Sequence, residues 1–99
     1  MKPTKYQKEI IDFLGPEYQM SDVTGTYSLY RKLNDCYDIE ILGTHGRNIP
    51  FTVIVCDISS GSPKPPVAEA HHDITTLRHL ERVLDEVCWK YAHPKPDAE

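Results

Sequence analysis

The sequence predicts an α+β fold in which an N-terminal helix, a three- or four-stranded antiparallel sheet and a C-terminal helix follow one another, with both helices on one sheet face. Three observations lead to this prediction. Helical apolar spacing is confined to the two ends of the chain, the middle shows strand-like apolar runs, and Asn, Asp, Gly and Pro separate these segments. Because 99 residues is the usual length of one domain, residues 1 to 99 are expected to form a single compact unit.

The first helix is expected to begin at "TKYQ", residues 4 to 7. This is a capping box, in which the Thr4 hydroxyl and the Gln7 amide satisfy backbone donors of the first turn. Gly15 supplies the left-handed residue after the last turn, and Pro16 prevents the helix from continuing. The face directed at the core is expected to carry Tyr6, Ile10, Phe13 and Leu14.

Two strands are expected in "TYSLYRKL" and "CYDIEIL", which follow the loop "PEYQMSDVTG" and are joined by a tight turn at Asn34-Asp35. We expect Leu33 to face Cys36 across this turn. The pairs that follow are Arg31 with Asp38 and Tyr30 with Ile39. The core face then carries Tyr30, Tyr37, Ile39 and Ile41, and the outer face carries Leu29, Leu33 and Leu42 beside Arg31, Asp38 and Glu40.

The third strand, "FTVIVCDI", is apolar on both sides and is therefore expected to be central in the sheet. After the loop "SSGSPKPP", the stretch "VAEAHH" is expected to form a short fourth strand or an extended lead-in to the last helix. That helix is predicted from Ile74 to Ala92 with Asp73 as N-cap, and residues 93 to 99 form a frayed tail. Its buried stripe is Ile74, Leu77, Leu80, Leu84, Val87, Cys88 and Tyr91.

Composition excludes several classes of function. Eleven basic against fifteen acidic side chains give a net charge of −4, which argues against a protein that binds nucleic acid through its phosphates. The charged N-terminus has no apolar run of the length of a signal peptide or membrane span, so a cytoplasmic protein without membrane contact is expected. Three cysteines without C-x-x-C spacing are typical of reduced thiols.

Residues 71 to 79, "HHDITTLRH", contain the residue types that bind zinc, but their spacing does not fit a metal site. The residue four before His79 is Thr75, and His72 is seven residues away, so no pair faces one ion from one helix face. The chain also has no Gly-rich phosphate loop, G-x-S-x-G elbow or H-E-x-x-H helix. The sequence therefore predicts a protein that is not an enzyme and that carries no metal or other cofactor.

The order of helix, three strands and helix resembles the double-stranded RNA-binding domain, and "GTHGRNIPF" carries Gly, His and Phe in the region where that family has them. In that family, a lysine-rich start of the second helix contacts phosphates. Here this place is taken by "VAEAHHDI", which includes Glu69 and Asp73. The resemblance therefore does not imply RNA binding.

The last helix carries an unusual set of exposed positions, at spacings of four, three and four, on the side away from its apolar stripe. Tryptophan and arginine together are enriched where proteins bind one another. The alternative is that Trp89 folds back under the tail or under the first helix. We expect a small non-catalytic intracellular protein that binds another protein or a second copy of itself, through this helix or the sheet face. Adaptors, immunity proteins and inhibitors, including those that phages and mobile elements direct at host proteins, are the classes that fit. The predicted contact residues are Arg78, Arg82, Asp85 and Trp89.

An alternative is a module that binds a small ligand, nucleotide or RNA. Its anionic group would be held by His45 and Arg47, together with the proline-rich loop that contains Pro63 and Pro66. This hypothesis requires these loops to cluster at one edge of the sheet.

Overall fold

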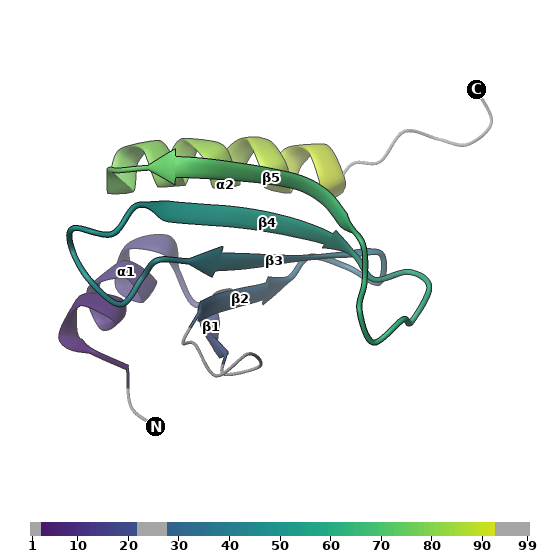
Figure 1. The fold of residues 1–99 in the computed structure, drawn as a ribbon, viewed down its shortest axis with the longest axis horizontal. Helices are drawn as coiled ribbons and strands as arrows, with labels where there is room; N and C mark the ends of the chain where they lie inside the picture. Colours follow the sequence, from purple (N-terminus) through teal and green to yellow (C-terminus); the bar gives the residue numbers. More distant parts are fainter. Residues whose placement is uncertain (1–2, 22–27, 93–99) are drawn as a thin grey trace.

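The computed structural model describes residues 3 to 21 and 28 to 92. It confirms an α+β fold with one antiparallel sheet and two helices (Figure 1). The sheet has five strands rather than three or four, in the order β1-β2-β3-β4-β5. The elements are α1 (Lys5–Leu14), β1 (Gln19–Ser21), β2 (Ser28–Lys32), β3 (Tyr37–Leu42), β4 (Phe51–Asp57), β5 (Val67–Ile74) and α2 (Leu77–Ala92).

The additional strand, β1, lies in a stretch that the sequence predicts to be a loop. Its three residues, Gln-Met-Ser, are too few to give a strand pattern in the sequence, and they form a strand by pairing with β2. At the other edge of the sheet, the predicted fourth strand is confirmed as β5, which continues to Ile74. Five strands also separate this fold from the three-stranded order of the double-stranded RNA-binding domain.

The pairing of β2 with β3 is shifted by one residue from the predicted register. Tyr30 faces Glu40, and Arg31 faces Ile39, so the side chains of β2 exchange faces relative to the prediction. Tyr30 therefore lies on the outer face, which it shares with Glu40, whereas Leu29 and Arg31 lie on the inner face. The predicted core face is right for Tyr37, Ile39 and Ile41 and wrong for Tyr30.

The shift arises in the turn between β2 and β3. The Leu33 amide donates to the Tyr37 carbonyl at 3.0 Å, which encloses three residues rather than two. The Asn34 side chain stabilises this longer turn, since its Oδ1 accepts from the amides of Cys36 and Tyr37 at 2.8 and 3.0 Å. Because the Asn34 side chain bonds to the backbone, a three-residue turn forms in place of the predicted two-residue turn at Asn34-Asp35.

One buried cluster joins the inner face of the sheet to residues of both helices. The prediction that the third strand is central is confirmed, because β4 pairs with both β3 and β5. Its inner side chains, Phe51, Val53 and Val55, are almost completely buried. The remainder of the cluster is Ile10, Tyr18, Leu29, Ile39, Ile41, Ile74, Leu80, Val83, Leu84 and Val87.

The capping box of α1 is confirmed. The Gln7 amide donates to Thr4 Oγ1 at 3.1 Å, and the Thr4 amide donates to Gln7 Oε1 at 2.9 Å. Gln7 is also buried, and its Nε2 donates to Oγ1 of the buried Thr44 at 3.2 Å, which attaches α1 to the loop after β3. Gly15 ends the helix with φ of 112°. Phe13 departs from the predicted core face, because its side chain is 45% exposed.

The start of α2 differs from the prediction. Ile74 belongs to β5, and Asp73 is not an N-cap but a strand residue with φ of 61°. Thr76 takes the capping role, because its Oγ1 accepts from the His79 amide at 3.0 Å. Among the buried residues of α2, Val83 was not predicted. The predicted tail, residues 93 to 99, lies outside the described residues.

Candidate functional site

The predicted contact residues of the last helix lie along the exposed side of α2. Leu80, Leu84 and Val87 direct the opposite side into the core, so residues 78, 82, 85 and 89 are turned away from it. Trp89 is 69% exposed, more than any other large apolar side chain of the described residues. We call this set, Arg78, Arg82, Asp85 and Trp89, the α2 stripe.

A polar network beside the stripe fixes the C-terminal end of α2 to β5. Glu69 accepts from Lys90 Nζ and Tyr91 Oη, both at 2.8 Å, and lies 2.5 Å from His71 Nε2. The Lys90 hydrogen bond, helped by His71 and Tyr91, lowers the pKa of the Glu69 carboxyl to about 2 despite its partial burial. The Tyr91 ring also packs on Tyr37, with centroids 4.5 Å apart. Trp89 therefore lies at a helix end that is attached to the sheet through Glu69 of β5 and Tyr37 of β3.

Of the residues of the alternative ligand site, Arg47 contacts α1. Arg47 Nη2 pairs with Glu9 Oε1 at 2.8 Å, and its guanidinium lies 4.6 Å from the centre of the Tyr6 ring. Both contacts are to α1, so Arg47 stabilises the attachment of the loop after β3 to this helix. His45 is exposed in the same loop.

The structure does not bring together the loops that the alternative requires. The loop with His45 and Arg47 precedes β4, and the loop with Pro63 and Pro66 follows it. Because the two loops leave opposite ends of one strand, they lie at opposite ends of the sheet (Figure 1). The clustering at one sheet edge that the alternative requires is therefore not met.

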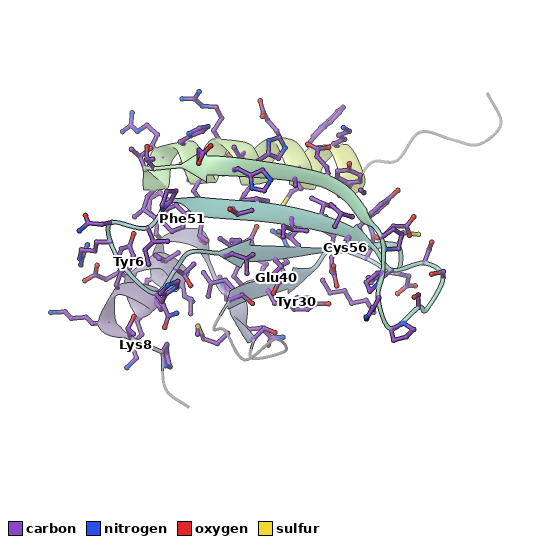
Figure 2. All side chains as sticks on the ribbon, in the orientation of Figure 1. Tyr6, Lys8, Tyr30, Glu40, Phe51 and Cys56 are labelled. Atoms are coloured by element: carbon purple, nitrogen blue, oxygen red, sulfur yellow. The ribbon has the colours of Figure 1, made fainter. Side chains whose placement is uncertain are left out.

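Sequence reasoning missed a hollow of about 500 Å³ on the outer face of the sheet. Figure 2 shows three of its side chains, Tyr30, Glu40 and Cys56, on the adjacent strands β2, β3 and β4. Tyr30 reaches this face only in the observed register, so the predicted register does not reveal it. In the sequence, the hollow is indicated by Asp38 and Glu40, which alternate with apolar residues on β3 and therefore share its outer face. The described lining is Gln19, Met20, Ser21, Tyr30, Asp38, Glu40, Cys56 and Pro65.

Hydroxyl groups hold both carboxylates of the hollow. Tyr30 Oη donates to Asp38 Oδ2, and Ser28 Oγ donates to Glu40 Oε2, each at 2.9 Å. Burial, followed by the hydrogen bond to Asp38 and its charge, raises the pKa of Tyr30 to about 12. Burial and then the charges of Asp38 and Glu40 also raise the pKa of the Cys56 thiol. Burial is the larger cause of both shifts, and the carboxylate charges, which give the hollow a negative potential, add to it.

The cysteines should report this potential directly. We expect iodoacetamide at pH 8 to alkylate Cys36 about tenfold faster than Cys56, because Cys36 is exposed and Cys56 is partly buried with a raised pKa. A time course of peptide mass spectrometry measures both rates in one sample. Glu40→Gln should accelerate alkylation of Cys56 and leave Cys36 unchanged. Equal rates in the unmodified protein would contradict the expected difference.

The histidines considered as metal ligands are spread over two elements. His71 lies on β5 beside Glu69, His72 is exposed on the same strand, and His79 is exposed on α2. Within residues 3 to 21 and 28 to 92, no group of three or more His, Cys, Asp or Glu side chains is arranged to hold a metal ion.

Neither helix of the described chain is long and apolar enough to cross a membrane. No protein-family model, curated protein or solved structure matches the chain. Function is therefore inferred from the surfaces that its own residues form.

Proposed function

We propose that this chain is a small non-catalytic intracellular protein that binds another protein through the α2 stripe. The observation that carries this proposal is the 69% exposure of Trp89, in line with Arg78 and Arg82 on a helix whose opposite side is buried. Tryptophan and arginine dominate binding free energy at protein interfaces, because one removes a large apolar area from water and the other donates several hydrogen bonds. An adaptor, immunity protein or inhibitor acts through such a surface.

The spacing of the stripe fits a helix that docks into a groove of its partner. Positions 78, 82, 85 and 89 correspond to i, i+4, i+7 and i+11, which is the pattern with which one helix face contacts a partner. Within the described part of the chain, no hydrogen bond or ion pair involves Arg78, Arg82 or Asp85. These three side chains are thus available for intermolecular contacts, and Glu69 attaches the end of the helix that carries Trp89 to β5.

We also infer that both helices cover the inner face of the sheet and leave the outer face uncovered. The buried cluster supports this inference, because it contains Ile10 of α1, four residues of α2 and the inner side chains of the strands. Ile54 and Cys56 on the opposite side of β4 are only partly buried. The protein would then offer a helix surface and a sheet surface on different sides.

Substitution of Trp89 tests the proposed interface. We expect Trp89→Ala to abolish capture of a partner by the immobilised full chain from an extract of the cell that encodes it. Arg82→Glu should have the same effect, because it reverses the charge at the centre of the stripe. Quantitative mass spectrometry of the captured proteins measures the loss, and thermal unfolding should change by less than about 3 °C.

A matched control separates the stripe from general exposure of aromatic surface. Phe13→Ala removes another exposed aromatic side chain, on α1, and should leave capture unchanged. If Trp89→Ala instead lowers stability strongly, Trp89 contributes to folding and the interface proposal is wrong. Equal loss of capture in Phe13→Ala would show that binding is non-specific.

A further inference from the structure

We propose that the hollow on the outer face binds an arginine side chain carried by an extended segment of a partner protein. This surface is distinct from the α2 stripe, because its described lining comes from β1 to β4 and from Pro65 in the loop after β4. Binding at the hollow can therefore be tested independently of the function proposed for α2.

Charge is the first reason. Asp38 and Glu40 both line the hollow, and no cationic side chain of the described residues pairs with either carboxylate. Lys32, which faces Asp38 across the strands, pairs with Asp35 instead at 3.6 Å. Two partly buried carboxylates that no described cationic side chain neutralises favour a cationic group that enters from outside.

The hydrogen bonds of the two carboxylates explain why arginine fits. Each carboxylate already accepts from a hydroxyl, Asp38 through Oδ2 and Glu40 through Oε2. The other oxygens, Oδ1 and Oε1, remain able to accept. Side chains two residues apart on one strand face are about 7 Å apart, which a planar guanidinium with five N–H donors spans better than an ammonium group.

The walls of the hollow fit the remainder of the side chain. The Tyr30 ring, Cys56 and Pro65 provide apolar surface against which the methylene groups of arginine can pack. A volume of about 500 Å³ also exceeds what a single inorganic cation needs. It accommodates the arginine together with neighbouring residues of an extended segment, whose backbone can contact Gln19 and Ser21 at the rim.

The test uses the full chain labelled with ¹⁵N and the capped peptide acetyl-Ala-Arg-Ala-Arg-Ala-amide, followed by NMR titration. We expect the amide signals of Tyr30, Glu40 and Cys56 to shift on binding. A peptide with citrulline in place of arginine has nearly the same shape without the charge, and it should bind about tenfold more weakly. Lysine peptide should bind more weakly than arginine peptide.

Variants of the protein locate the site. Asp38→Asn and Glu40→Gln should each weaken arginine peptide about tenfold. Glu86→Gln removes the same charge from the exposed side of α2 and should change the affinity by less than about twofold. Glu40→Gln keeps an acceptor for Ser28, so it remains informative if Asp38→Asn does not fold. Trp89→Ala should leave peptide binding unchanged.

Several results would overturn the proposal. Equal affinity for the citrulline peptide would show that charge does not drive binding, and equal weakening by Glu86→Gln would show only general attraction to an acidic protein. Shifts confined to α2, or loss of binding in Trp89→Ala, would place the peptide on the stripe. Equal affinity for free arginine amide would assign the hollow to a small cation rather than to a protein segment.

Discussion

Gly43→Ala is expected to lower the free energy of unfolding by about 3 to 5 kcal/mol, which could leave the chain unfolded at 25 °C. Gly43 has φ of 83°, a conformation that side chains with a Cβ rarely adopt. A Cβ at this position would also lie against the backbone carbonyl oxygen of Pro50, far inside van der Waals contact. Both problems arise because the loop after β3 returns closely on itself before β4.

Gly61→Ala is the matched control for this prediction. Gly61 has a similar φ of 73°, but no atom lies within 4 Å of the position of an added Cβ. Its substitution therefore carries only the backbone strain, about 1 kcal/mol. Urea unfolding followed by circular dichroism measures both variants. Equal losses in the two variants would mean that the contact of the added Cβ with Pro50 costs no free energy beyond the backbone strain.

Features set by neighbouring residues were predictable from the sequence. The capping box at Thr4 and Gln7 depends on four consecutive residues, and the central position of β4 follows from its apolar residues on both sides. Helical spacing alone predicts which side of α2 faces away from the core, and Trp89 lies on that side, but spacing leaves open whether Trp89 folds back, and its 69% exposure comes from the structure. In each case, the information lies within a few residues of the feature.

Features set by one distant or one irregular contact were not predictable. The Asn34 side chain stabilises a turn that is one residue longer than predicted. Because of this one residue, Tyr30 lies in the hollow and not in the core. Similarly, the sequence alone suggests that Gln7 is a surface residue of α1. In the structure it is buried, because its side chain donates to Thr44, which is 37 residues away. The predicted register turns Tyr30 inward and so does not reveal the hollow, although the sequence correctly predicts its carboxylates, Asp38 and Glu40, on the outer face.

Glu69→Gln is expected to lower stability at pH 7 by about 1 to 2 kcal/mol. The carboxylate accepts from Lys90, Tyr91 and His71, and the substitution removes its charge while retaining one amide oxygen as acceptor. The magnitude is kept well below that of a fully buried ion pair, because solvent reaches the side chains of Glu69 and Lys90 and screens their attraction. Urea unfolding at pH 7 provides the measurement.

The effect of pH distinguishes the charge of Glu69 from its packing. Its pKa in the folded protein is about 2, against an ordinary value near 4.5, so the unfolded chain binds a proton more readily. The stabilisation is therefore complete above about pH 4.5 and is lost as pH falls toward 2. We expect the difference in unfolding free energy between the unmodified protein and Glu69→Gln to shrink across this window.

Glu86→Gln removes an exposed carboxylate from α2 without touching the Glu69 network, so it should show neither the loss at pH 7 nor the change below pH 4.5. A difference between the unmodified protein and Glu69→Gln that stays constant from pH 7 to pH 2 would mean that Glu69 acts by packing alone. Under the proposed function, the network should also affect partner binding, because Lys90 and Tyr91 directly follow Trp89. Loosening this end of α2 should weaken partner capture in Glu69→Gln at neutral pH, although the α2 stripe itself is intact.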